Sequence, residues 1–139
     1  MSVIVTDAGF GPDVWHKGFV KPDQLAANDC LAVAMDLGPD AEVEALAGKL
    51  DRVALIRVAF PSFADGRGFT VARRLRLMGY TGRLRATGHV IADQYAMARR
   101  SGFDEVEIDD DLAARQPEGQ WLARANWRAY DYQSRLRGV

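Results

Sequence analysis

Residues 53–88 read VALIRVAFPSFADGRGFTVARRLRLMGYTGRLRATG, and this stretch decides the fold. Residues 53–60 are β-branched and mostly apolar, which is typical of a buried strand. After a glycine-rich loop, Thr70 is a suitable N-cap for a helix that runs to about Met78. Residues 83–87 then predict another strand. A strand, a helix and a strand in this order predict a βαβ unit with two parallel strands.

The same alternation extends this unit in both directions. Upstream, the apolar run 31–35 predicts a strand, and residues 40–50 predict a helix because their apolar side chains recur at helical spacing. Downstream, residues 90–101 predict a helix and residues 105–108 predict a strand. Glutamate alternates with apolar residues in this last strand, which suits an edge or half-exposed position.

We therefore expect an α/β fold, a small and open parallel sheet of βαβ units flanked by helices in three layers. The alternative is a partial βα barrel, because four βα units are half of such a barrel. Glycine and proline punctuate residues 1–30, which predicts irregular chain or a hairpin with a short strand at Val3–Val5. Residues 119–137 predict an aromatic-rich C-terminal helix that closes the core or forms a homodimer interface.

The composition narrows the class of protein. With 139 residues, 48% of them apolar and 27% charged, the chain fits a single globular domain over residues 1–139. No uncharged apolar run approaches the roughly 18 residues of a membrane helix, and the N-terminus lacks the basic flank of a signal peptide. A single cysteine, Cys30, cannot form an internal disulfide. We therefore expect a cytoplasmic protein that does not enter a membrane.

The charges are distributed unevenly along the chain. Between Arg67 and Arg100 there are eight arginines and one acid, Asp93, so that this segment carries +7 while the whole chain carries −1. Such asymmetry suggests a basic face toward an anionic partner. The alternative is that these arginines lie on solvated helix faces and are balanced in space by acids from elsewhere.

The topology predicts where a site should lie. The carboxyl ends of parallel strands meet at one edge of the sheet, where ligands of α/β folds bind. Four loops should converge there, and they carry Asp36 with Gly38, residues 61–68, residues 87–89 and residues 109–111.

The second of these loops is the strongest candidate for binding an anion. Gly66 and Gly68 permit close approach of the backbone, and the start of the following helix offers unpaired N–H groups. Arg67 adds a planar guanidinium that suits sulfite, sulfate or phosphate. Thr70 and Gly88 complete the candidate anion-binding set.

Two residues are candidates for proton transfer at this edge, Asp65 and His89. A structural role is the alternative for each of these side chains. Asp65 then caps the turn, Arg67 pairs with Asp36 or Asp109, and His89 bonds a neighbour. The chain contains no P-loop, no dinucleotide fingerprint and no spacing typical of metal ligands, so we predict neither a cofactor nor a metal.

Several blocks of the chain resemble one bacterial family. They read FPSFADGRGFTVARRLR at 60–76, GYTGRLRATG at 79–88, Asp-Gln at 93–94 and Gly-Phe-Asp at 102–104. In this order they resemble the family called domain of unknown function 934, over about residues 31–108. Members are typically encoded beside sulfite reductase and other enzymes of sulfate assimilation, and some are labelled oxidoreductases. The resemblance therefore implies a pathway and no mechanism.

This chain departs from the family pattern at two positions. Ala64 stands where threonine is usual, and Ser101 stands where many relatives have cysteine. The resemblance therefore supplies no redox thiol here, and the lone Cys30 does not replace a thiol pair.

Three functions compete on these observations. The first is an accessory or anion-binding factor of sulfite reduction, which contacts sulfite reductase or an acidic electron carrier. The second is an enzyme that acts on a small anionic substrate at the sheet edge, with Arg67 and the glycine amides as the anion site. The third, a nucleic-acid-binding module, is disfavoured because the chain is slightly acidic and has no recognised motif.

Overall fold

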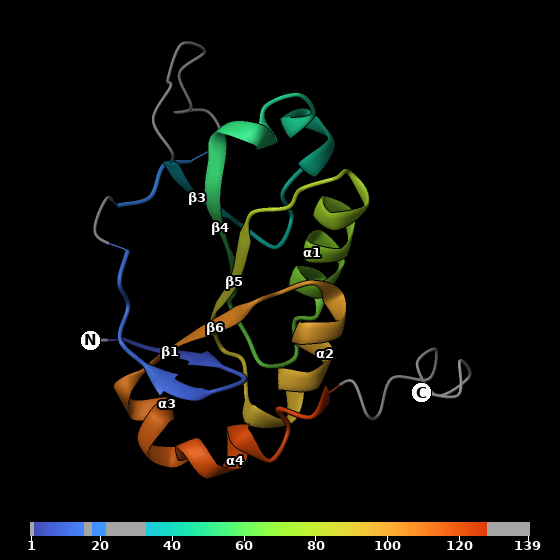
Figure 1. Ribbon diagram of the computed structural model, residues 1–139. Coiled ribbons are helices and arrows are strands. Elements are labelled where there is room, and N and C mark those ends of the chain that lie inside the picture. The colour runs from blue at the N-terminus through green and yellow to red at the C-terminus, as the bar shows by residue number, and fades with distance from the viewer. Residues whose placement is uncertain (1, 16–17, 22–32, 128–139) are drawn as a thin grey trace.

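The computed structural model describes residues 2–15, 18–21 and 33–127, which build one six-stranded sheet with helices packed against it (Figure 1). The strand order is β2-β1-β6-β5-β4-β3. The strands are β1 (Ser2–Thr6), β2 (Gly9–Gly11), β3 (Val33–Leu37), β4 (Val53–Phe60), β5 (Arg83–Gly88) and β6 (Glu105–Asp109). Strands β3 to β6 are parallel, whereas β1 pairs antiparallel with both β2 and β6. The α/β prediction is confirmed.

The helices follow the strands as the βαβ pattern predicts. The α-helices are α1 (Arg67–Leu77), α2 (Tyr95–Ser101), α3 (Asp110–Arg115) and α4 (Glu118–Leu122). Short 3-10 turns are η2 (Val43–Leu46), η3 (Leu50–Arg52) and η4 (Ala92–Gln94). Over the ranges that the structure describes, none of these helices has the length and apolar character that crossing a membrane requires.

The helical layer is one-sided, which corrects the expectation of three layers. Each parallel strand lies beside the strand that follows it in sequence, so right-handed crossovers place α1 and α2 on the same face (Figure 1). On the opposite face, Asp13 bonds Arg85 and the Phe19 ring packs on Arg57. Val20 forms a parallel β-bridge with Met35 along the outer edge of β3. The sheet shares sequential strand order with a βα barrel, but β2 and β3 remain separate edges.

The core lies between the sheet and the helical layer. Phe60 at the end of β4 packs its ring 4.9 Å from that of Phe69 and 5.8 Å from that of Phe103. Trp121 of α4 is buried edge-on against Tyr95 of α2, with 6.1 Å between ring centroids. The prediction that these aromatic residues close the core is confirmed for Trp121.

Two helix predictions need correction. Helix α1 begins at Arg67 and not at Thr70, because Asp65 Oδ1 accepts the Arg67 N–H at 3.1 Å and starts the turn earlier. The helix predicted over residues 40–50 is two separate 3-10 turns. Its helical spacing is interrupted where Ala47 is extended, with ψ of 132°, and Gly48 takes a positive φ of 80°.

The two ends of the chain also differ from the predictions. Strand β6 is not an edge strand, because β1 pairs with it in the register Val3 to Ile108. The hairpin alternative is confirmed for the first residues, which form β1 and β2. Helix α4 ends at Leu122, residues 123–126 are not helical, and residues 128–137 of the predicted helix lie outside the described residues, as does Cys30.

Candidate functional site

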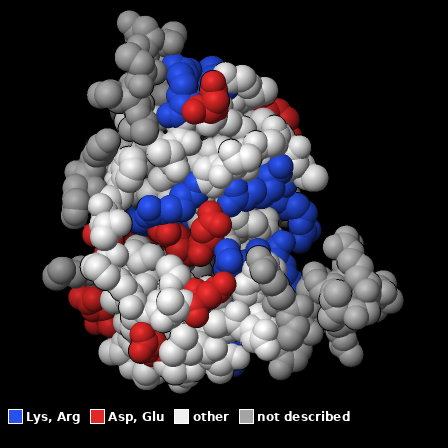
Figure 2. All heavy atoms as spheres, viewed as in Figure 1, with Lys and Arg blue, Asp and Glu red and all other residues white. Residues whose placement is uncertain are grey.

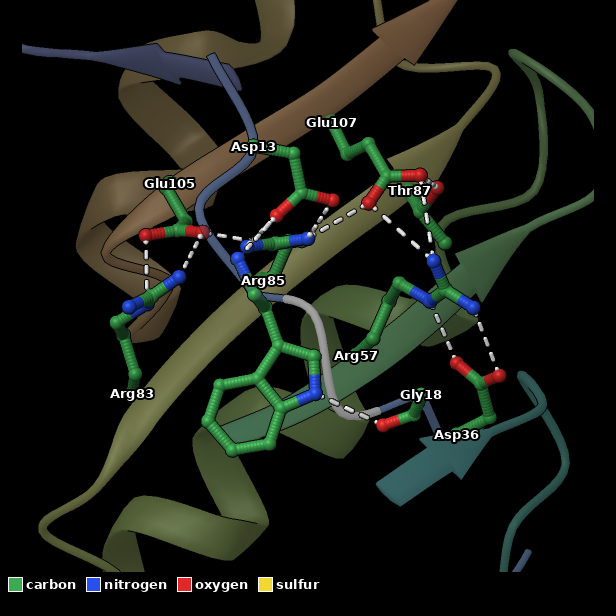
Figure 3. Close-up of polar contacts among 10 residues, drawn as sticks. Asp13, Gly18, Asp36, Arg57, Arg83, Arg85, Thr87, Glu105 and Glu107 are labelled. Carbon is green, nitrogen blue, oxygen red and sulfur yellow. Dashed lines mark hydrogen bonds and ion pairs between the residues drawn. The ribbon is translucent and has the colours of Figure 1, made fainter. Parts of the chain in front are cut away.

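The sheet face opposite α1 and α2 carries a row of charged side chains (Figure 3). The strand register aligns Asp36 of β3 with Arg57 of β4, Arg57 with Arg85 of β5, and Arg85 with Glu105 of β6. Side chains aligned in this way share one face of the sheet, because the pleat alternates. Charged residues at alternate positions of four strands are thereby collected into one network.

Arg85 is the buried centre of this network. Its side chain is 0% exposed and reaches Glu105 Oε2 at 2.6 Å, Glu107 Oε1 at 2.8 Å and Asp13 Oδ2 at 3.2 Å. Burial works against the charge of Arg85, but Glu105 and the other carboxylates outweigh it and raise the pKa of Arg85. The guanidinium therefore stays charged and fixes the carboxylates around it.

Arg57 occupies the next position in the row and is more accessible, with 22% of its side chain exposed. Its Nε and Nη2 donate to the two oxygens of Asp36 at 2.6 and 2.8 Å, and this bidentate bond is the main cause that raises the pKa of Arg57. Its Nη1 reaches both oxygens of Glu107 only at 3.3 Å. The Phe19 ring lies 3.6 Å from the guanidinium carbon.

A cleft of about 690 Å³ opens beside Arg57, toward the carboxyl ends of β3, β4 and β5. Its polar lining consists of Lys21, Asp36, Arg57, Thr87 and Glu107. The remaining lining, which carries no charge, consists of Leu37, Gly38, Ala41 and Ala59. We call this feature the sheet cleft.

In the sheet cleft, the Nη1 group of Arg57 makes only long hydrogen bonds. Charge-assisted N–H···O bonds are usually about 2.7–2.9 Å long, so the 3.3 Å contacts of Arg57 Nη1 are poor. Glu107 keeps a 2.8 Å bond from Arg85 and a 3.4 Å contact from the Thr87 hydroxyl. An oxyanion that displaces Glu107 from Arg57 would therefore break only the two 3.3 Å contacts of Nη1.

The predicted anion loop is organised differently. Arg67 donates to Asp65, with its Nη2 at 2.7 Å and its Nε at 3.0 Å, and this bond lowers the pKa of Asp65. The prediction that Asp65 caps the turn is confirmed. The predicted pairing of Arg67 with Asp36 or Asp109 is wrong, because Asp36 holds Arg57 and Asp109 caps α3. The Arg67 side chain is 60% exposed.

The glycines around this loop serve packing. Gly66 has a negative φ of −90°, so it does not use the conformational freedom of glycine. A Cβ on Gly68 would lie 2.5 Å from the Phe60 ring, and a Cβ on Gly88 would lie 2.6 Å from the Phe60 carbonyl oxygen. Gly88 also requires a positive φ of 104°. Both glycines therefore let neighbouring segments approach Phe60.

Four of the predicted site residues line two separate hollows. Arg67 and Thr70 line a hollow of about 540 Å³ together with Arg74. Gly88 and His89 line a separate cavity of about 170 Å³. The His89 Nδ1 lies 3.3 Å from the Phe60 carbonyl oxygen, and its ring packs edge-on against Phe63. These contacts agree with the structural alternative for His89, in which its side chain bonds a neighbour.

The basic segment is largely paired with acids. Six of its eight arginines form ion pairs, and these are Arg67 with Asp65, Arg74 with Glu44, Arg76 with Asp104, Arg83 and Arg85 with Glu105, and Arg99 with Asp7. Figure 2 shows basic and acidic side chains next to one another on the face in view. The alternative interpretation, in which acids from elsewhere in the chain balance these arginines in space, therefore applies to most of the segment.

Sequence reasoning missed Arg57, Glu107 and Lys21 as members of a site. The available signal was the position of charges within the predicted strands. Arg57, Arg85 and Glu107 each lie between two buried apolar residues of their strand, so their side chains point away from the core. Without the strand register, these positions could not be placed on one face.

Comparison with known proteins supports the resemblance found in the sequence. No curated protein matched the chain. Residues 34–138 match the family described as "bacterial protein of unknown function" (DUF934), and this range includes β4 to β6, α1 to α4 and all of β3 except Val33. The match spans most of the 139 residues. The chain therefore belongs to the DUF934 family.

Proposed function

We propose that this protein is an accessory, anion-binding factor of sulfite reduction, and that its anion binds in the sheet cleft at Arg57. The single observation that carries the anion site is the weakly engaged Nη1 of Arg57 at the carboxyl ends of parallel strands. The link to sulfite rests on the resemblance to a family whose members are encoded beside sulfite reductase. Sulfite, sulfate and phosphate share the oxyanion chemistry that a guanidinium recognises.

Arg57 suits this role better than Arg67. The fork of Arg57 is held in place by Asp36, so little side-chain entropy is lost when Nη1 binds an anion. Arg57 is also partly buried, where charges interact more strongly than in bulk water. Arg67 is mostly exposed and already bonded to Asp65. Lys21 adds a second cation to the lining of the sheet cleft.

Substitution of Arg57 by lysine tests this site. The lysine keeps a positive charge beside Asp36 and Glu107 but lacks the planar fork, so we expect anion affinity to fall about tenfold or more. Calorimetric titration of the full-length protein with sulfite, sulfate and phosphate at low salt measures the change. The matched control is Arg73→Lys, an exposed position on α1 that should leave affinity unchanged. Equal affinities of Arg57→Lys and wild type would contradict the site.

The accessory role requires a partner, and the outer surface of the helical layer offers a docking face. Leu77 of α1 is 82% exposed and Met97 of α2 is 53% exposed, and the exposed Arg73 and Arg100 lie on the same two helices. Exposed apolar side chains beside arginines suit a partner with acidic residues around an apolar patch. We therefore propose that sulfite reductase or an acidic electron carrier docks on these two helices.

A co-purification experiment tests this docking face. Purified sulfite reductase should retain the wild-type protein at low and moderate salt, and the double substitution Arg73→Glu, Leu77→Ser should weaken retention severalfold. Arg115→Glu, an exposed position on α3, is the control for a charge reversal elsewhere on the surface. Failure of wild type to associate with the reductase or an acidic carrier would count against the accessory role. Self-association on this face would instead support the predicted homodimer.

A further inference from the structure

The size of the sheet cleft points to a ligand larger than an inorganic ion. We propose that the cleft receives an organic monoanion, in which an oxyanion head group binds Arg57 and an apolar body lies along Ala59 and Ala41. This proposal rests on the anion contact at Arg57 proposed above. The cleft measures about 690 Å³, which falls within the roughly 300–1,000 Å³ of pockets that hold whole organic ligands.

The strand register places an apolar surface directly beside the guanidinium. Ala59 follows Arg57 by two residues on β4, so both face the same side of the sheet, about 7 Å apart along the strand. Thr87 of β5 aligns with Ala59 across the sheet. The short side chain of Ala59 leaves open space next to Arg57, and Ala41 lines the same cleft. The body of a ligand whose head group binds Arg57 would therefore lie against an apolar surface and not in solvent.

The carboxylates limit the charge of the ligand. Asp36 and Glu107 line the cleft, and each is matched by an arginine, Arg57 or Arg85. The lining holds two cations, Arg57 and Lys21, against these two carboxylates, so a second anionic group on the ligand would add negative charge that no further cation of the lining balances. One anionic group and an uncharged body therefore fit the cleft best. Sulfonates, sulfate esters and carboxylates share this chemistry.

A homologous series of ligands measures the contribution of the body. The full-length protein is titrated with sulfate, methanesulfonate, butane-1-sulfonate and benzenesulfonate under the same conditions. Burial of each additional methylene should strengthen binding, so affinity should rise on the order of tenfold or more from methanesulfonate to butane-1-sulfonate. A matching carboxylate, pentanoate, shows whether the head group must be tetrahedral. In Arg57→Lys, binding of every member should weaken.

A substitution that fills the apolar side of the cleft separates the contribution of the ligand's body to affinity from that of its head group. Ala59→Leu should abolish the gain from methanesulfonate to butane-1-sulfonate, while sulfate should still bind and its binding should still depend on Arg57. Ala41→Leu is the second variant if Ala59→Leu does not fold, and Ala123→Leu, at an exposed position after α4, is the control. Equal affinity across the series, with sulfate still bound through Arg57, would overturn this proposal and leave the anion site standing. Absence of binding by every anion would overturn both.

Discussion

Replacing Arg85 by methionine is expected to lower the free energy of unfolding by about 3–5 kcal/mol. Arg85 is completely buried and is the shared partner of Asp13, Glu105 and Glu107. Methionine fills a similar volume but carries no charge, so the buried Glu105 and the partly buried Glu107 keep their negative charges with fewer partners. Urea unfolding at neutral pH, followed by circular dichroism, measures the loss.

Two further variants show that the cost arises from the buried charges. Arg73→Met makes the same change at an exposed position of α1, and it should alter stability by less than about 0.5 kcal/mol. Adding Glu105→Gln to Arg85→Met should recover part of the loss, because it removes one of the uncompensated charges. A loss below about 1 kcal/mol for Arg85→Met would contradict a buried ion network at the centre of the sheet.

Replacing Gly88 by alanine is expected to cost at least about 2 kcal/mol. Gly88 ends β5 with a φ of 104°, which side chains disfavour, and a Cβ there would lie 2.6 Å from the Phe60 carbonyl oxygen. This oxygen also accepts the His89 N–H at 2.9 Å, so neither backbone segment can move away without losing that bond. The midpoint of urea unfolding should fall accordingly.

The matched control for this substitution is Gly119→Ala. Gly119 lies in α4, and a Cβ there would have no atom within 4 Å. Alanine favours helix over glycine by about 0.5–1 kcal/mol, so this variant should be as stable as wild type or slightly more stable. If Gly88→Ala and Gly119→Ala had the same effect, the close approach of β5 to Phe60 would be wrong. A loss of stability for Gly88→Ala would also assign this glycine a structural role beside its predicted role in anion binding.

The sequence predicts the parallel part of the fold well because that part is local. Residues 53–60, 67–77 and 83–88 each carry their own periodicity, and right-handed crossovers arrange them without further information. The position of β6 could not be predicted in the same way. Its second neighbour is β1, which lies about a hundred residues away in sequence and pairs with it antiparallel. The sequence predicts one helix over residues 40–50 in place of two 3-10 turns, because helical spacing of apolar residues does not exclude a break at Gly48.

The edge of the sheet that holds the sheet cleft could be predicted from the sequence, whereas the residues that line this cleft could not. The carboxyl edge of the sheet follows from parallel strands, and the sheet cleft opens toward that edge. The sequence directed attention to Arg67 because it lies in a glycine-rich loop before a helix. Arg57 lies within a strand, where its neighbours in space are Asp36 and Glu107, respectively 21 and 50 residues away. Only the register of four strands brings these groups together.

The position of a bound oxyanion tests the anion site at Arg57 most directly. Crystals of the full-length protein soaked in selenate, a heavy analogue of sulfate, give an anomalous signal that locates the ion without reference to activity. We expect the strongest peak in the sheet cleft, in contact with Arg57 Nη1. A strongest peak beside Arg67 and Thr70, or a sheet cleft without a peak while selenate binds elsewhere, would contradict the account.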